Sequence, residues 1–216
     1  MAPPLGRDVL RLQAFSDGVF AFAATLLVVS LEVPASYSQL LEALAGFPAL
    51  AIAFAAIVSL WAIHREFFAR YPLGDGISMV VNAVLLFVVL IYVYPLKLLA
   101  ELAVHKLFRV GTPTVGDMTS AQVQGVYVIF AVAVLMTCLA IAVLHLRAWQ
   151  LRDELRLDDE AHADLVAGGR GYLGIGLVAV LAIVVATADL GTGWGLPIWL
   201  LLVLSPVTEW FVRSRS

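Results

Sequence analysis

The chain has 216 residues, of which 62% are hydrophobic and only 13% are charged. A soluble domain carries about a quarter charged residues, so a surface with so few charges cannot face water on all sides. The net charge of −3 comes without a clustered stripe of basic residues, which excludes the electrostatic footprint of nucleic-acid binding. The single cysteine, Cys138, excludes an intrachain disulfide. The composition therefore indicates an integral membrane protein.

Apolar segments long enough to cross a bilayer follow one another along the chain. A spanning helix needs about 20 mostly apolar residues, because the hydrocarbon core is about 30 Å thick and a helix rises about 1.5 Å per residue. The segments that meet or nearly meet this length are 15–33, 44–63, 77–99, 122–146, 172–188 and 194–212. They use nearly the whole chain, so we expect a single all-α domain over residues 1–216, with six transmembrane helices and no soluble domain.

The basic residues predict the orientation of these segments. One set of segment ends is flanked by ten arginines, namely Arg7, Arg11, Arg65, Arg70, Arg147, Arg152, Arg156, Arg170, Arg213 and Arg215. The other set of ends has three basic residues, Lys97, Lys106 and Arg109. Short loops rich in Lys and Arg stay in the cytoplasm. We therefore expect both termini to be cytoplasmic, which agrees with an even number of spans.

Two connections need an interpretation. Residues 147–170 mix arginines with carboxylates and are typical of a solvated cytoplasmic extension of helix 122–146, with His145 at the membrane interface. In the external connection, Thr114-Val115-Gly116 looks like the start of a potassium-channel filter. Such filters follow an apolar pore helix on a re-entrant loop, whereas the residues before this one are polar and interrupted by Gly111 and Pro113. We expect an exposed turn and no re-entrant filter loop.

The first segment contains a carboxylate, Asp17, beside Ser16. A carboxylate at the centre of a spanning helix costs about 2.5–3.5 kcal/mol on insertion scales, so it normally faces the bundle interior and finds a partner. Asp17 is therefore either a structural anchor of this helix or a titrating member of an ion or proton relay. Candidate partners at the same depth are Trp61, His64 and Asn82. The alternative for Trp61 and His64 is a place in the interfacial aromatic belt.

Helix geometry favours the interpretation of Asp17 as a structural anchor. At about 100° per residue, the side chains of Phe22, Leu26 and Val29 lie within about 60° of one another on one face, with Thr25 beside them. Asp17 lies about 140° from Phe22 on the same projection. If the face of Phe22 turns towards a shared axis, Asp17 points back into its own subunit.

The same stretch carries a resemblance to a known family. Arg11 followed by Phe15-Ser16-Asp17 resembles the signature of the transmembrane protein 175 family, lysosomal potassium channels and their bacterial relatives. The similarity continues through Gly18-Val19-Phe20-Ala21, Thr25-Leu26-Leu27 and Glu32, and then to Trp61, His64 and Asn82. It covers the first segment closely and the next two loosely, and one six-helix unit corresponds to the bacterial form.

The resemblance implies a homotetrameric, potassium-preferring cation channel in a bacterial plasma membrane. Its four first helices are then expected to line a central pore for monovalent cations, with potassium as the permeant species and no cofactor. Carried over by position, Phe22, Leu26 and Val29 form the apolar constriction and Thr25 a polar layer, while Glu32 lies at the pore mouth. The residues expected to hold the pore helix are Arg11, Phe15, Ser16, Asp17, Trp61, His64 and Asn82. Bacterial relatives usually carry isoleucine at the position of Phe22 and leucine at that of Val29.

The residues leave alternatives to the channel, one of which is a non-conducting scaffold. A proton-coupled secondary transporter would use Asp17 and His64 as a relay, although the halves show no internal repeat and Pro95 lies near the end of its segment. A membrane enzyme needs a converging catalytic set, which the sequence lacks, so we expect no enzymatic activity.

Overall fold

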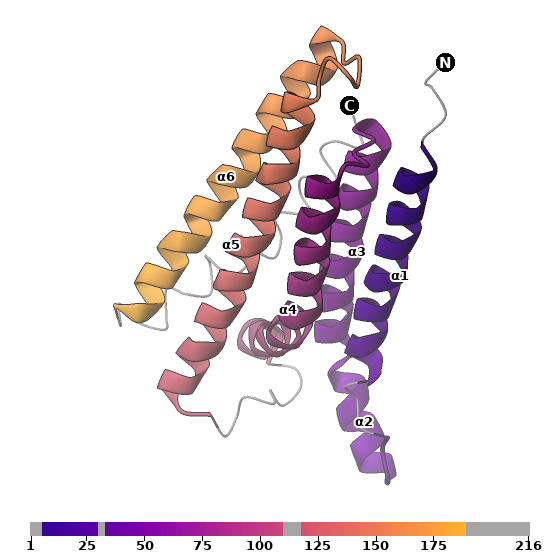
Figure 1. Ribbon diagram of the computed structural model, residues 1–216. Coiled ribbons are helices and arrows are strands. Elements are labelled where there is room, and N and C mark those ends of the chain that lie inside the picture. The colour runs from indigo at the N-terminus through magenta and orange to yellow at the C-terminus, as the bar shows by residue number, and fades with distance from the viewer. Residues whose placement is uncertain (1–5, 30–32, 110–117, 189–216) are drawn as a thin grey trace.

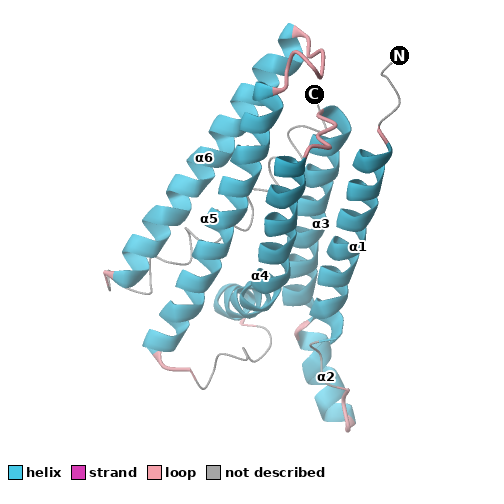
Figure 2. Cartoon of the chain, viewed as in Figure 1, coloured by secondary structure: helices cyan, strands magenta, loops and turns pink. Residues whose placement is uncertain are grey.

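The computed structural model describes residues 6–29, 33–109 and 118–188. Every element in these ranges is a helix (Figure 2). The helices are α1 (Arg7–Val29), α2 (Tyr37–Ala45), α3 (Phe47–Arg70), α4 (Gly76–Phe108), α5 (Ser120–Gln150) and α6 (Asp159–Thr187). All except the short α2 are long and apolar enough to cross a membrane. The all-helical fold class is confirmed, and the predicted span 194–212 lies outside the described residues.

The long helices alternate in direction. The start of α1, the end of α3, the start of α4, the end of α5 and the start of α6 all lie at one end of the bundle (Figure 1). Helix α1 packs against α3 and α4, while α6 packs along α5, which in turn contacts α4. Eight of the ten arginines used to predict the orientation belong to this end or its connections, so we call it the arginine-rich end.

The predicted boundaries were too narrow at several ends. Helix α1 begins at Arg7 instead of 15, α3 continues to Arg70 instead of 63, and α4 continues to Phe108 instead of 99. An apolar run marks only the part of a helix inside the hydrocarbon, whereas the backbone hydrogen bonds of a helix continue into its polar flanks. The short helix α2, which Ser36 caps through its side chain, was not predicted.

The connection 147–170 differs most from its prediction. Helix α5 is not extended through it but ends at Gln150, and a turn with Arg156 at φ 53° reverses the chain. Helix α6 then begins at Asp159, because Asp158 accepts a hydrogen bond from the backbone N–H of Ala161 and caps the helix. The charged stretch is therefore a helical hairpin, and its second half is the first part of α6.

Pro95 lies inside α4 and not near its end. The first part of α4 runs beside α3, while its last turns are seen nearly end-on (Figure 1). A proline removes one backbone hydrogen bond and clashes with the preceding turn, which is the usual cause of such a bend.

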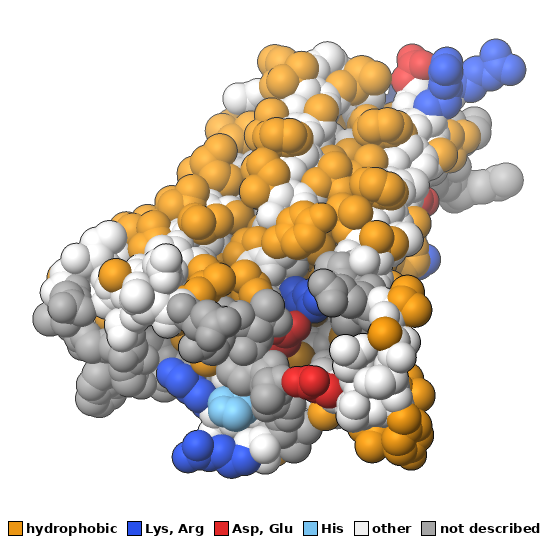
Figure 3. All heavy atoms as spheres, turned by 90° about the horizontal axis from the view of Figure 1, so that it is seen from below, with side chains coloured by type: hydrophobic (Ala, Val, Ile, Leu, Met, Phe, Trp, Pro, Cys, Tyr) orange, Lys and Arg blue, Asp and Glu red, His pale blue; other side chains and the backbone are white. Residues whose placement is uncertain are grey.

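Large apolar side chains remain exposed along the flanks of the bundle. On α6, Leu173, Leu177 and Leu181 are each more than half exposed, and α5 exposes Ile129 and Met136. Seen from below, apolar side chains are spread over much of one flank (Figure 3). A soluble monomer rarely exposes so large an apolar area, so these flanks are suited to lipid or to neighbouring protein.

Candidate pore helix and its polar network

Helix α1 has one face that packs and one that does not. Its buried residues recur at intervals of three and four, as the helical repeat requires: Val9, Leu12, Ser16, Phe20, Ala23 and Leu27. This face lies against α3 and α4. The only polar member of the face is Ser16, which is fully buried. A buried hydroxyl needs a hydrogen-bond partner, and Ser16 has two.

A chain of hydrogen bonds joins three helices at Ser16. His64 Nε2 on α3 bonds to Asn82 Oδ1 on α4 at 2.7 Å, and Asn82 Nδ2 donates to Ser16 Oγ at 3.0 Å. Ser16 Oγ then donates to the carbonyl oxygen of Leu12 at 2.9 Å. His64 and Asn82 are buried, with 5% and 0% exposure. The chain therefore fixes both the rotation and the depth of α1 against its two neighbours.

Asp17 makes a separate contact with α3. Trp61 Nε1 donates to Asp17 Oδ1 at 2.7 Å, and the guanidinium of Arg65 lies 5.4 Å from the centre of the Trp61 ring. The predicted relay partners are thus bonded to different groups, Asp17 to Trp61 and His64 to Asn82. This arrangement suits an anchor, since both polar groups are held by neutral side chains of neighbouring helices.

The residues expected to line a pore lie on the other face of α1. Phe22 and Val29 are 57% and 71% exposed, and Thr25 is exposed with its hydroxyl bonded to the carbonyl oxygen of Ala21. Leu26 differs from them because it is half-buried against the core. Glu32, expected at the pore mouth, lies outside the described residues.

Two of the expected anchors do not join the network. Phe15 is 62% exposed, and Arg11 is exposed and makes no hydrogen bond or ion pair with another described residue. The structure thus brings together Ser16, Asp17, Trp61, His64 and Asn82 and leaves these two outside. Both belong to the motif that carries the family resemblance, which is why they were expected to hold the helix.

Both histidines expected near a membrane interface are buried inside the bundle. His64 lies inside α3 and not beyond its end, because α3 continues to Arg70. His145 is 6% exposed, its Nδ1 bonds to the carbonyl oxygen of Ile141, and its ring stacks near Phe67. Each has a helical segment of several residues beyond it, since α3 continues to Arg70 and α5 to Gln150.

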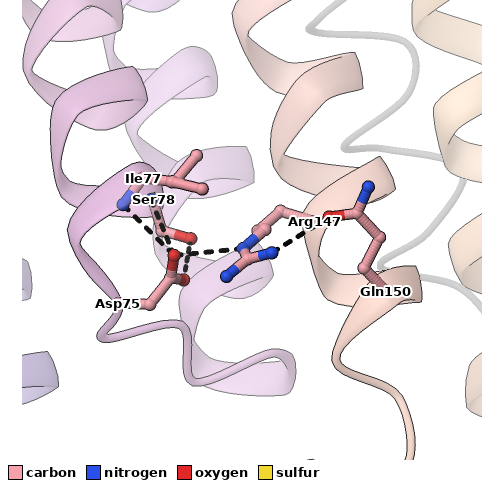
Figure 4. A network of polar contacts seen from close by, with 5 residues as sticks. All are labelled: Asp75, Ile77, Ser78, Arg147 and Gln150. Carbon is pink, nitrogen blue, oxygen red and sulfur yellow. Dashed lines mark hydrogen bonds and ion pairs between the residues drawn. The ribbon is translucent and has the colours of Figure 1, made fainter.

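A second polar contact was missed at the arginine-rich end. Asp75 caps α4 by accepting from the backbone N–H groups of Ile77 and Ser78, and Arg147 Nε on α5 donates to Asp75 Oδ2 at 3.0 Å (Figure 4). Gln150 accepts from the same guanidinium at 3.0 Å. An Asp directly before an apolar run is an N-cap signal that the sequence does contain. Its pairing with Arg147 depends on the approach of α5 to α4.

Comparisons with known proteins agree with this architecture. The family described as endosomal/lysosomal potassium channel TMEM175 matches residues 11–92. A potassium channel of Marivirga tractuosa is 28% identical over 88% of this chain and 78% of its own length. A potassium channel of Chamaesiphon minutus is 36% identical over 46% of this chain and 53% of its own length.

The solved structures extend the likeness to all the long helices. A crystal structure of a variant of the potassium channel MtTMEM175, bound to a nanobody–MBP fusion protein, has a TM-score of 0.78 at 26% identity and covers 100% of this chain and 99% of that one. The chain is therefore similar to the TMEM175 family, in sequence over residues 11–92 and in fold to one of its solved members. A lysosomal potassium-selective TMEM175 homolog from Chamaesiphon minutus has the same fold, with a TM-score of 0.67 at 22% identity over 95% of this chain and 99% of its own.

The TMEM175 match includes the whole polar network. Residues 11–92 begin at Arg11 and end beyond Asn82, so they contain Ser16, Asp17, Trp61 and His64. The resemblance inferred from the motif is confirmed at the level of the family. The roles of individual residues in conduction stay predictions.

Proposed function

We propose that this chain is the subunit of a potassium-preferring cation channel, a single six-helix domain that assembles as a homotetramer around a central pore. Potassium is the permeant species, no cofactor takes part, and the chain is not an enzyme. The relatives named above are potassium channels, and the fold matches the crystal structure of the MtTMEM175 variant over 100% of this chain and 99% of that one.

The observation that carries the proposal is the division of α1 into two faces. One face is held by the Ser16 chain and the Asp17–Trp61 bond, while Phe22, Thr25 and Val29 stay exposed on the isolated subunit. A cyclic assembly repeats one face of one helix around its axis, so four copies of this short face are enough to build a conduction path. Rings of apolar side chains close such a path by dewetting, and lining dipoles and pore width select the ion.

The orientation in the membrane is part of the proposal. The arginine-rich end faces the cytoplasm of a bacterial plasma membrane, since short basic loops are retained there. Both termini are then cytoplasmic, and Glu32 follows α1 at the external mouth, where a carboxylate concentrates cations.

Bilayer recordings under asymmetric potassium and sodium test this function. We expect passive currents that prefer potassium and need no pH gradient, and larger currents for Leu26→Ala, because removal of an apolar side chain from a constriction makes it easier to wet. Leu177→Ala on the exposed flank of α6 is the control and should conduct as the parent does. Transport that requires a proton gradient would instead support the coupled transporter.

A further inference from the structure

A cavity that the conduction path does not use lies between α3 and the α5–α6 hairpin. Its volume is about 660 Å³, and its lining comes from the second half of α3, the last turns of α5, the first half of α6 and Leu85 of α4. These segments meet at the arginine-rich end (Figure 1). Pockets that hold small organic ligands have volumes of roughly 300–1,000 Å³. The cavity therefore has the size of a ligand site.

Aromatic rings form much of its wall. Phe67, Tyr71, His145 and Tyr172 all line the cavity and are each less than 9% exposed. The ring centres of Phe67 and His145 are 4.7 Å apart, and those of His145 and Tyr172 are 5.5 Å apart. The faces of phenyl and phenol rings carry negative electrostatic potential, which attracts cations that have been stripped of water.

Besides the buried His64, the other polar side chains of the lining are charged. Glu66 and Arg70 come from α3, and Glu160 and Asp164 from α6; all four are exposed and so lie where the cavity opens. Arg70 Nη2 and Asp164 Oδ2 are 2.6 Å apart and neutralise each other. Glu66 and Glu160 make no ion pair with any residue in the described ranges. The opening therefore keeps an excess of negative charge.

We infer that this cavity binds an organic cation, an ammonium group carried on an apolar or aromatic body, that enters from the arginine-rich end. The body is buried among the rings, and the charged group lies near the two carboxylates. An organic anion of the same size meets like charge at the opening and the negative ring faces inside. The carboxylates and the ring faces therefore both disfavour the binding of an anion.

Two permanently charged probes test the inference without any measurement of ion flux. The full chain in lipid nanodiscs is titrated with phenyltrimethylammonium and with benzenesulfonate, and heat of binding is recorded. We expect saturable binding of the cation and none of the anion. Equal binding of the two probes, or no binding of the cation up to about ten millimolar, would overturn the inference while leaving the channel proposal intact.

Variants locate the site. Ala167 is exposed and lines the cavity, so Ala167→Phe should abolish cation binding by filling the entrance, while Val166→Phe on the neighbouring position, which does not line it, should bind as the parent does. The double change Glu66→Gln with Glu160→Gln should weaken binding by about fivefold, the size expected for exposed charge pairs. Full binding by Ala167→Phe would place the probe elsewhere, for instance in the pore, and would refute the site.

Discussion

At the scale of single residues, the network around Ser16 is a continuous line of donors and acceptors. His64 donates to Asn82, Asn82 to Ser16, and Ser16 to the backbone of its own helix. Each side chain in this line hydrogen-bonds to the next, so the loss of any one of them leaves a buried donor or acceptor of its neighbour unsatisfied. Such a group costs about 1–3 kcal/mol. The line thus makes the position of α1 sensitive to substitutions on three helices.

Ser16→Ala should lower the free energy of unfolding by about 1–3 kcal/mol, because the buried amide of Asn82 loses its acceptor. Ser59→Ala is a matched control: Ser59 is also buried but bonds only to the carbonyl oxygen of Ala55 in its own helix. We expect the control to change stability by less than about 0.5 kcal/mol. Thermal unfolding of the two purified variants measures the difference, and equal losses would contradict an interhelical role for Ser16.

At the scale of elements, the start of α4 depends on one carboxylate. Asp75 lies in the connection before the spanning helix, caps α4 and pairs with Arg147 on α5, so the same group begins one helix and attaches the next. Partial burial opposes the charge of Asp75, but hydrogen bonds from Ser78 and Arg147 outweigh it and lower the pKa below the ordinary value of 3.8.

The sign of this shift defines a pH dependence. Because the folded protein binds the proton of Asp75 more weakly than the unfolded chain does, the contribution of Asp75 is complete above pH 3.8 and is lost as the pH falls through the lower folded pKa. Arg147→Gln should flatten this acid-side loss and reduce stability by up to about 1 kcal/mol at neutral pH.

Unfolding midpoints between neutral and acid pH check this expectation. Arg152→Gln is the control, since the contact of Arg152 with Asp153 is 3.8 Å long and exposed on both sides. An acid-side loss that is the same in both variants and in the parent would mean that the Asp75–Arg147 pair contributes nothing measurable.

At the scale of the whole molecule, the apolar surface exceeds what one subunit can hide. The flank of α6 and the free face of α1 both expose large side chains, but their polar bonds differ. Helix α1 is held in a defined rotation against two helices by the Ser16 chain and the Asp17–Trp61 bond, whereas α6 is bonded near its own start to the end of α3, through Ala161 and Asp164. A helix that faces only lipid gains little from a fixed rotation, because the lipid is the same on every side. The bonds on α1 therefore favour protein contact at its free face.

Oxidative cross-linking distinguishes the two surfaces. In a background of Cys138→Ala, Val29→Cys should link neighbouring subunits of the proposed tetramer, since four copies of this position would surround the proposed axis. Leu177→Cys on α6, equally exposed at 69%, should stay unlinked. A linked product from Leu177→Cys alone would mean that α6, and not α1, meets the next subunit.

Much of the fold could be predicted because the bilayer restricts it so strongly. Five of the six predicted spans correspond to helices, since a run of about 20 apolar residues has few other stable conformations in lipid. The boundaries were less predictable because helices continue through polar residues, and the hairpin at 147–170 was missed because its charges suit either a long helix or a turn.

The sequence by itself determined that the chain is helical, membrane-embedded and similar to the TMEM175 family, and it placed Ser16, Asp17, Trp61, His64 and Asn82 among the groups in need of partners. Only the tertiary structure decided which partner each one has: Trp61 for Asp17, Asn82 for His64 and Ser16, and Arg147 for Asp75. The reason is physical. Periodicity along one helix shows which face a residue occupies, whereas a hydrogen bond between helices depends on their relative rotation and depth, which packing sets.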